Sequence, residues 1–583
     1  MSLFAPKPRL PGVHAGEDLQ NGPAALRLDG VRMRALESGR SRLIATAVGF
    51  FVAFAVIGVR MIDVAVLDAN PARPRDLPQA RTDGLEMERA DITDRNGIIL
   101  ATSLPTVSLY ARANEVLDAG EAATKLVSVL PDLDPADVRA RLAGGRPFVY
   151  LRRNLTPRQQ YDVNALGIPG LYFEKGERRV YPHGPLAAHI VGMTDIDNKG
   201  IAGIERRFDQ GLRSSQQPLR LAVDIRVQTV VRNELQRAVE TFRAVGATGM
   251  VMDAATGEML AMVSLPDYDP NDPPAGQAEA LFNRATKGAY EMGSTFKLFN
   301  TAMALESGRV NIGSSFDATK PLKYGNHEIH DDHAQNRWLN VSEILIHSSN
   351  IGSARMAMEA GVEFQRSFLG RMGMLSTPTL ELPEIGAPLV PKPWREINAI
   401  TIAFGHGLSV TPLQLVSGVA ALVNGGLFRP ATLLPHPEGE EIPGERVVKA
   451  RTSAQVRQLM RMVVTEGTGK KAEVPGYEVG GKTGTAEKAV NGSYRKKAVL
   501  SSFVAAFPMD APRYVVLVMI DEPQATKETY GFITAGWTAA PATGRIVAQV
   551  APLMGLMPKA VPAPASMART PTAHGSRDVA AVE

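Results

Sequence analysis

The sequence predicts an α+β protein with a membrane anchor, a β-rich domain and a larger domain built on an antiparallel sheet flanked by helices. Three observations support this prediction: an uncharged apolar run near the N-terminus, short strands with turn signals after it, and amphipathic helices mixed with apolar strands in the second half. At 583 residues the chain is long enough for two or three domains. Its apolar share of 44% and charged share of 21% are typical of a globular protein.

The predicted anchor covers residues 43–62. Leu43 to Val59 contains no charged residue, which makes it long enough for a short membrane span. Arginines precede the run and aspartates follow it, so the positive-inside rule places residues 1–42 in the cytoplasm and the rest outside. A buried core helix and a cleaved signal peptide are the alternatives. We expect one uncleaved span of a bacterial inner membrane.

Two folded domains are expected, at residues 63–225 and 226–558, followed by a disordered tail at 559–583 that is rich in Ala and Pro. In the first domain Asp94 to Gly97 is a turn signal, because Asn-Gly suits positive φ. Strands are predicted at Ile98–Ala101 and Thr106–Ala111. Helical spacing follows in residues 113–165, broken into short pieces by prolines.

The second domain is expected to begin with an amphipathic helix over Arg226–Val245 and a strand pair. Its further predicted elements are strands at Thr248–Asp253, Glu258–Ser264, Leu500–Pro508 and Tyr514–Ile520, and a helix around Thr543–Val550. The net charge of +4, without a basic stripe interleaved with aromatics, argues against nucleic acid as a ligand. The absence of cysteine excludes a disulfide framework, a zinc–thiolate site and a cysteine nucleophile.

Three short motifs carry the chemistry. Ser294 and Lys297 lie at positions i and i+3 of a predicted helix start, so they share one face. Ser348-Ser349-Asn350 interrupts two helical stretches, and Gly480 to Thr485 is a glycine-flanked edge strand containing Lys482-Thr483-Gly484-Thr485. Each motif occurs by chance when it stands alone. Together they are the signature of penicillin-binding proteins and serine β-lactamases.

A serine hydroxyl becomes a good nucleophile only when a base removes its proton. Lys297 is the candidate base, provided that burial and a second cation, Lys482, lower its pKa from the ordinary value of about 10.4. Ser348 can relay a proton to the leaving amine, and Asn350 offers an amide to the substrate backbone.

Substrate recognition is predicted on the edge strand. Thr483 and Thr485 supply hydroxyls for a carboxylate, and Gly484 leaves room for close approach. The backbone N–H groups of Ser294 and Thr485 would form the oxyanion hole. No cofactor and no metal are expected. The polar cluster of His327, His330, Asp331, Asp332 and His333 lacks the spacing of a helical zinc motif, so we interpret it as a surface loop and keep a metal site as the alternative.

The pattern resembles the class B penicillin-binding proteins over nearly the whole length after the anchor. Further stretches carry this resemblance: Arg89 with Asp94 to Gly97, Arg179 to Pro182, Gly203 to Asp209, Asn283 to Ala285 and Tyr290 to Ser294. Ala90 departs from the family, which commonly has Gly there. Gly405 to Gln414 is most similar to the division-specific, FtsI-type members, and Lys482 to Lys488 followed by a long polar loop points the same way.

The resemblance implies a peptidoglycan D,D-transpeptidase of the division septum, with residues 63–225 as a non-catalytic pedestal of the dimerisation type. Ser294 would attack the penultimate D-Ala of a stem pentapeptide, and β-lactams would acylate the same serine. The implied partners are a glycosyltransferase of the FtsW type and other divisome proteins. The alternatives are an elongation-specific relative and a β-lactam-sensing or β-lactamase-like protein.

Overall fold

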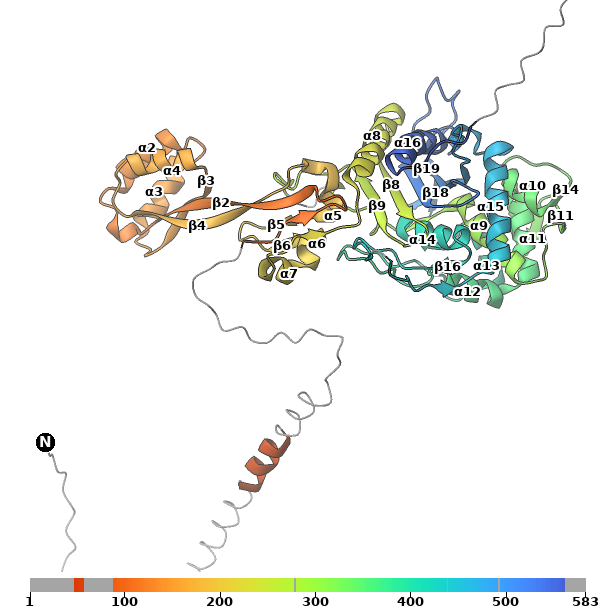
Figure 1. Ribbon diagram of the computed structural model, residues 1–583, viewed down its shortest axis with the longest axis horizontal. Helices are drawn as coiled ribbons and strands as arrows, with labels where there is room; N and C mark the ends of the chain where they lie inside the picture. The colour runs from red at the N-terminus through yellow and green to blue at the C-terminus, as the bar shows by residue number, and fades with distance from the viewer. Residues whose placement is uncertain (1–46, 57–87, 277–278, 438, 491–492, 561–583) are drawn as a thin grey trace, which may run out of the picture. The chain divides into compact units, whose positions relative to one another are not determined.

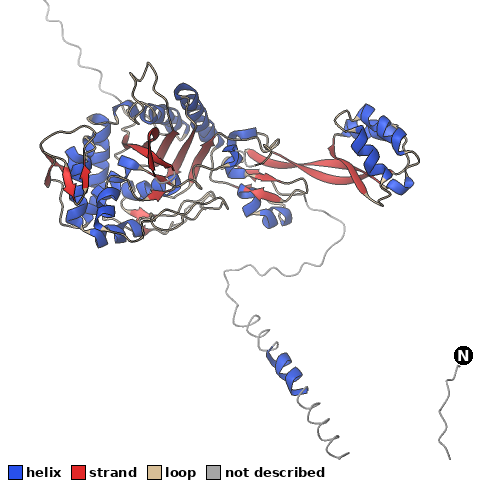
Figure 2. Ribbon diagram, turned by 180° about the vertical axis from the view of Figure 1, so that it is seen from behind, coloured by secondary structure: helices blue, strands red, loops and turns tan. Residues whose placement is uncertain are grey.

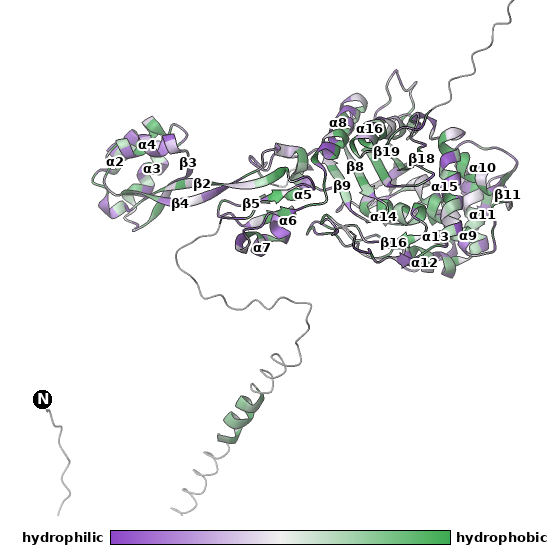
Figure 3. Cartoon of the chain, viewed as in Figure 1, coloured by the Kyte–Doolittle hydropathy of each residue, from purple (hydrophilic) through white to green (hydrophobic). Residues whose placement is uncertain are grey.

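The computed structural model describes residues 47–56, 88–276, 279–437, 439–490 and 493–560. The chain divides into two compact units, residues 1–85 and 86–583. In the first unit residues 47–56 are helical and apolar, and they lie within the predicted anchor; its other residues and the tail at 1–42 lie outside the described part (Figure 3). Among the described residues no helix is long and apolar enough to cross a membrane. The predicted tail at 559–583 is described only for its first two residues.

The N-terminal part of the second unit, residues 88–224, is called the pedestal below. Its main sheet has the order β3-β2-β1-β7, with β4 paired to β2 (Figure 1). The strands are β1 (Ile92–Thr93), β2 (Ile99–Ala111), β3 (Val149–Leu155), β4 (Leu171–Val180) and β7 (Leu219–Arg220). Helices α2 (Ala119–Val129), α3 (Pro135–Ala143) and α4 (Pro157–Ala165) pack on one face, where Leu109, Leu126 and Leu155 are buried.

Strand β2 replaces the two strands predicted at Ile98–Ala101 and Thr106–Ala111. Pro105 lies inside it and pairs with Glu177 of β4, whereas the pairing of β2 with β3 begins only at Val107. Proline lacks an N–H, and a strand tolerates it where one side has no neighbour. The prediction of helices alone in residues 113–165 missed β3.

A buried ion network holds the base of the pedestal together. Arg89 Nε lies 2.7 Å from Glu205 Oε2, and Arg179 Nε lies 2.6 Å from Glu205 Oε1. All three side chains are at most 1% exposed. The surrounding elements are η3 (Gly184–Ala187), α5 (Ala188–Val191), β5 (Met193–Thr194), β6 (Gly200–Ala202), α6 (Gly203–Arg207) and α7 (Asp209–Ser214). The family-like motifs at Arg89, Arg179 and Glu205 therefore meet at one point.

The larger domain is built on an antiparallel five-stranded sheet with the order β18-β19-β20-β8-β9, as predicted (Figure 2). The strands are β8 (Gly246–Asp253), β9 (Met259–Leu265), β18 (Gly480–Val490), β19 (Ser493–Phe507) and β20 (Tyr514–Asp521). One face packs against α8 (Ile225–Phe242) and α16 (Ala539–Leu553). The other faces α9 (Lys297–Glu306), α14 (Pro412–Val423) and α15 (Ala450–Thr465). The motif strand β18 lies at the edge of this sheet.

Strand β18 also corrects one prediction. The sequence after Lys488 was expected to form a long polar loop, but β18 continues to Val490, and Val490 pairs with Ser493 at the start of β19. Continued ladder pairing explains why a polar sequence is extended here.

The remaining elements are η2 (Ala113–Glu115), η4 (Glu279–Leu281), β10 (Tyr290–Glu291), η5 (Gly293–Phe296), β11 (Ser315–Asp317), β12 (Leu322–Tyr324), β13 (His327–Ile329), β14 (Trp338–Asn340), α10 (Val341–Ile346), α11 (Asn350–Ala360), α12 (Val362–Arg371), α13 (Glu396–Ile402), β15 (Ser409–Val410), β16 (Leu427–Phe428), β17 (Glu445–Arg446) and η6 (Lys470–Ala472).

Candidate active site

Ser294 lies in the short helical turn η5, directly before α9. Gly293 has φ +53°, which lets the chain leave β10 and enter this turn at once. Lys297 is the first residue of α9, and its Nζ lies 3.0 Å from Ser294 Oγ. The lysine is fully buried, whereas Ser294 is partly exposed. The nucleophile candidate can therefore meet a substrate while its base candidate is shielded from water.

Ser348 lies between the two lysines of the predicted site. It occupies the break between α10 and α11 with φ +57°. Its Oγ lies 3.1 Å from Lys297 Nζ and 3.0 Å from Lys482 Nζ, and its carbonyl oxygen accepts from Lys297 at 2.5 Å. The structure thus brings all three motifs together around one hydroxyl group.

Burial controls the charge of both lysines. It lowers the pKa of Lys297 to about 7, against a smaller opposing effect of Asp331 and Asp332. Burial also lowers the pKa of Lys482 well below its usual value, and the charge of Lys297 lowers it further. The sequence analysis expected the charge of Lys482 to lower the pKa of Lys297. In the structure it is the charge of Lys297 that lowers the pKa of Lys482. A lysine with a pKa near 7 is a workable base at neutral pH.

Asn350 is part of the same cluster, but its contacts differ from the expected one. Its Oδ1 accepts from Lys297 Nζ at 2.7 Å, and its Nδ2 donates to the carbonyl oxygen of His330 at 2.9 Å. The amide therefore orients the lysine, and an amide contact with a substrate backbone stays a prediction.

The sequence analysis assigned Asp331 to a surface loop, with a metal site as the alternative, but the structure places it in the candidate active site. Its carboxylate accepts from Ser349 Oγ at 2.7 Å and from the backbone N–H groups of Asn350 and Ile351 at 2.5 and 2.9 Å. It therefore holds the start of α11 and the Ser-Ser-Asn motif in place. In the part of the chain that the structure describes, no group of three or more His, Cys, Asp or Glu side chains could hold a metal ion. Nothing in the sequence signalled this role, because Asp331 lies 18 residues before Ser349.

The edge strand β18 lies very close to the turn that carries Ser294. A Cβ added to Gly484 would come within 2.6 Å of Ser502 Oγ, 2.7 Å of Thr295 Cγ2 and 2.8 Å of the Met292 carbonyl oxygen. These distances are too short for any side chain. Glycine is needed here because two elements of the protein meet, whereas the sequence analysis attributed it to the approach of a substrate.

Two threonines complete the strand. Thr483 Oγ1 lies 2.7 Å from Thr468 Oγ1 and accepts from Lys482 Nζ at 3.3 Å. Thr485 Oγ1 accepts from the backbone N–H of Ala535 at 3.3 Å. Thr468, which follows α15, had no signal in the sequence. The Thr483 hydroxyl lies beside the buried amine of Lys482, an arrangement that suits a carboxylate.

A pocket of about 310 Å³ adjoins this cluster and is lined by Asn350, His327, His406 and Glu487. The residues of β13 form part of its lining, and so does Glu487, which follows Thr485 on β18. The cluster brings together the candidates for a nucleophile, a base, a hydroxyl relay and a carboxylate site. These are the parts that acyl transfer through a serine ester requires.

Comparisons with known proteins agree with this geometry. Residues 247–542 match the penicillin-binding protein transpeptidase domain, and residues 85–240 match the penicillin-binding protein dimerisation domain. The chain is 41% identical to a probable peptidoglycan D,D-transpeptidase FtsI of Caulobacter vibrioides, over 82% of this chain and 83% of that protein. It is 32% identical to peptidoglycan D,D-transpeptidase FtsI of Escherichia coli K12, over 83% of this chain and 87% of that protein.

Solved structures have the same fold. A crystal structure from Atopobium parvulum aligns with a TM-score of 0.63 at 23% identity, over 81% of this chain and 99% of that chain. A crystal structure of a peptidoglycan glycosyltransferase from Burkholderia ambifaria aligns with a TM-score of 0.51 at 30% identity, over 58% of this chain and 99% of that chain. The two domain matches, the identity to the FtsI proteins and the convergence of the three motifs lead to one conclusion: the chain belongs to the class B penicillin-binding proteins of the FtsI type.

Proposed function

We propose that this protein is a peptidoglycan D,D-transpeptidase that crosslinks the septal cell wall through an acyl-enzyme on Ser294. The observation that carries the proposal is the buried amine of Lys297, within 3.0 Å of Ser294 Oγ and 3.1 Å of Ser348 Oγ. Its lowered pKa of about 7 makes a neutral amine available without a metal or a histidine. The names of the FtsI relatives agree with this activity.

In the first half-reaction, Ser294 Oγ attacks the carbonyl carbon of the penultimate D-Ala as neutral Lys297 takes its proton. The tetrahedral intermediate collapses, the C–N bond breaks, and the terminal D-Ala leaves as an amine. Ser348 Oγ, between the two lysines, passes a proton to that amine. In the second half-reaction, an amine of a neighbouring stem attacks the ester carbonyl and loses a proton to the same relay. The new amide bond forms as the ester C–O bond breaks, and protonated Lys297 returns a proton to Ser294 Oγ.

We assign the substrate carboxylate to Thr483, Thr485 and Lys482 on β18. A carboxylate at these hydroxyls would lie beside a buried amine whose pKa is low in the free protein. The arriving negative charge favours the protonated amine, so binding and protonation of Lys482 are coupled. The oxyanion hole of the Ser294 and Thr485 N–H groups belongs to the same proposal.

The remaining assignments complete the proposal. Residues 43–62 would span the inner membrane with residues 1–42 in the cytoplasm. Residues 63–225 would form a pedestal and 226–558 the periplasmic transpeptidase domain, with 559–583 as a tail. The pedestal and the span would dock an FtsW-type glycosyltransferase and other divisome proteins. A reporter fused after Asp68 should then be periplasmic, and one fused before Arg40 cytoplasmic.

A labelled penicillin tests the chemistry. The wild-type protein should gain the mass of one penicilloyl group on Ser294, and Ser294→Ala should gain none. Ser307→Ala, a serine at the far end of α9, is the matched control and should label like the wild type. An adduct on the Ser294→Ala variant would refute the assignment.

Depletion of the protein in cells tests the division role. It should give filaments without septa, whereas round cells would favour the elongation-specific alternative.

A further inference from the structure

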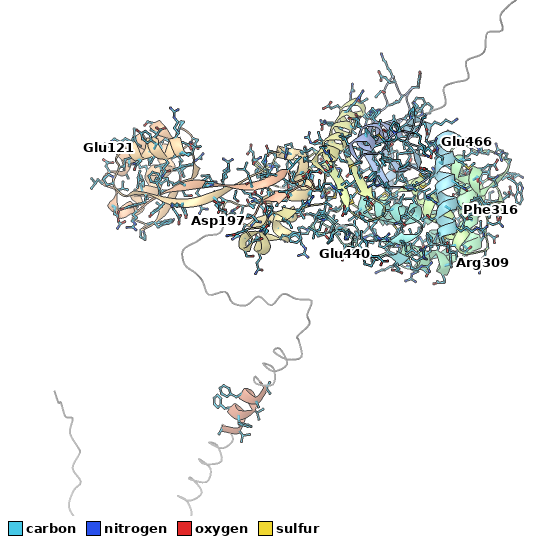
Figure 4. All side chains as sticks on the ribbon, viewed as in Figure 1. Glu121, Asp197, Arg309, Phe316, Glu440 and Glu466 are labelled. Atoms are coloured by element: carbon cyan, nitrogen blue, oxygen red, sulfur yellow. The ribbon has the colours of Figure 1, made fainter. Side chains whose placement is uncertain are left out.

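The pedestal contains a cavity that the transpeptidase reaction does not use. It has a volume of about 430 Å³, within the range of roughly 300–1,000 Å³ that is typical of ligand pockets. The outer face of β2, β3 and β4 forms one wall, through Ser108, Tyr150 and Glu174. The turn between β5 and β6, which carries Asp197, forms another wall (Figure 4). The cavity is therefore bounded by two separate parts of the pedestal.

Charges of both signs line the cavity: Arg89, Arg153, Lys175 and Arg213 against Glu174, Glu177 and Asp197. Arg153 donates to Asp197, and Arg213 lies 3.3 Å from Asp209, which also accepts from Arg89 at 2.8 Å. Because an ionic ligand requires an excess of the opposite charge, a lining of both signs favours a neutral ligand. Such a ligand must nevertheless offer many hydrogen-bonding groups, since carboxylates, guanidinium groups and amides surround it.

Aromatic rings lie beside the polar groups. Tyr150 lines the cavity, its hydroxyl donates to Glu174, and Arg153 lies over its ring at 4.1 Å. A row of rings continues from it, with Phe148 4.8 Å from Tyr150 and Tyr110 4.6 Å from Phe148. Phe148 is 45% exposed. Of these rings Tyr150 lines the cavity, so a ligand with some apolar C–H surface as well as hydrogen-bonding groups suits it.

A pyranose ring with hydroxyl and N-acetyl groups combines these properties. We propose that this pedestal cavity binds the uncharged, N-acetylated sugars of a glycan chain. The inference rests on the proposed function for the source of the ligand, because peptidoglycan consists of such chains with charged stem peptides attached. A protein partner fits the same surface less well, since charged side chains are depleted at the centres of protein interfaces. The pedestal would then hold the glycan chain while its stem peptide reaches Ser294.

Gly176 offers a way to close the cavity without disturbing the fold. It lines the cavity on β4, and its φ is not in the left-handed region. A Cβ added there would meet only Thr106 Oγ1, at 3.9 Å, on the strand opposite. Gly176→Phe should therefore fill the cavity, and an aromatic residue suits a strand. Gly211→Phe is the control, because an added Cβ at this exposed helical glycine meets no described atom within 4 Å.

The test uses the full-length protein in detergent and the neutral tetramer of β-1,4-linked N-acetylglucosamine, with binding measured by calorimetry. We expect saturable binding with a Kd below about 10 mM, at least tenfold weaker in Gly176→Phe and unchanged in Gly211→Phe. Glu174→Ala, at an exposed carboxylate, should also weaken binding. If Gly176→Phe shows no thermal unfolding transition and is therefore not folded, Glu174→Ala serves as the test variant in its place. Wild-type protein acylated by penicillin should bind the sugar as well as the free protein.

Three outcomes would overturn the inference: no saturable binding to the wild type, full binding by both cavity variants, or loss of binding after penicillin acylation. The third would place the sugar in the catalytic cleft. Loss of a protein partner in Gly176→Phe, with no sugar binding to the wild type, would assign the surface to protein docking instead. A wild type that binds the sugar but is not acylated by penicillin would refute the proposed function alone.

Discussion

The pKa of Lys297 makes the rate of acylation depend steeply on pH. With a pKa of about 7, half of the lysine is neutral at pH 7. About nine-tenths is neutral at pH 8 and only about one-hundredth at pH 5. The second-order rate of acylation by a penicillin should therefore rise about a hundredfold between pH 5 and pH 8 and then level off. A lysine with its ordinary pKa of about 10.4 would instead make the rate rise about tenfold per unit up to about pH 9 and level off only above about pH 10.

Asp331 allows this origin of the pH dependence to be tested. Its negative charge raises the pKa of Lys297 and so opposes the effect of burial. Asp331→Asn removes the charge but keeps an oxygen that can accept from the N–H groups of Asn350 and Ile351. The midpoint of the pH profile should therefore move to lower pH. Asp317→Asn is the matched control, because Asp317 is not among the groups that shift Lys297.

Stopped-flow acylation with a chromogenic cephalosporin measures the rate between pH 5 and pH 9 for the wild type and both variants. The rate constant at low substrate concentration reports on groups of the free enzyme. A rate that still rises tenfold per unit at pH 9 would show that the titrating base does not have a pKa near 7, and would refute the lowered pKa of Lys297 as the origin of the profile. A midpoint that moves equally in Asp331→Asn and Asp317→Asn would show that the shift does not come from the site.

Three further predictions follow from the same contacts. Lys297→Arg should reduce acylation at least about a hundredfold in the same assay, because arginine keeps the charge but cannot be deprotonated. Gly484→Ala should destabilise the transpeptidase domain and reduce acylation, since its Cβ would lie 2.6 Å from Ser502 Oγ; thermal unfolding and labelled-penicillin gels measure both effects. Glu205→Ala should lower the free energy of unfolding by about 3–5 kcal/mol in urea titrations, because it leaves two arginines buried, whereas Arg141→Ala at an exposed pair should cost at most about 1 kcal/mol.

The features that were predicted correctly depend on neighbours in the sequence. Ser294 and Lys297 share a face because the spacing of a helix turn fixes it, and Asp94 to Gly97 turns because Asn-Gly accepts positive φ. The helix predicted over Arg226–Val245 is α8, displaced by a few residues. Local rules therefore sufficed for most elements and for placing the three motifs on a helix, a loop and a strand.

What the sequence could not predict depends on residues far apart in the chain. Strand β4 has a mixed sequence without clear alternation, and it is a strand because β2 offers a pairing edge. Thr468 and Asp331 reach the site from elements that only the tertiary fold brings near it. The sequence analysis also did not foresee why glycine is needed at position 484. The amino-acid sequence alone does not show that β18 closely approaches the turn that carries Ser294.

The coupling of the two lysines links binding to catalysis. In the free protein both amines are buried beside one serine hydroxyl, and their pKa values are both lowered, so the pair disfavours two charges at neutral pH. In the proposed mechanism, a substrate carboxylate at Thr483 would favour the protonated form of Lys482. That positive charge, on the other side of Ser348, then favours the neutral form of Lys297. The carboxylate of a D-Ala terminus or a β-lactam would thus increase the neutral fraction of Lys297, the base proposed to activate Ser294. A ligand without a carboxylate would leave more of Lys297 protonated and therefore unable to accept the proton of Ser294.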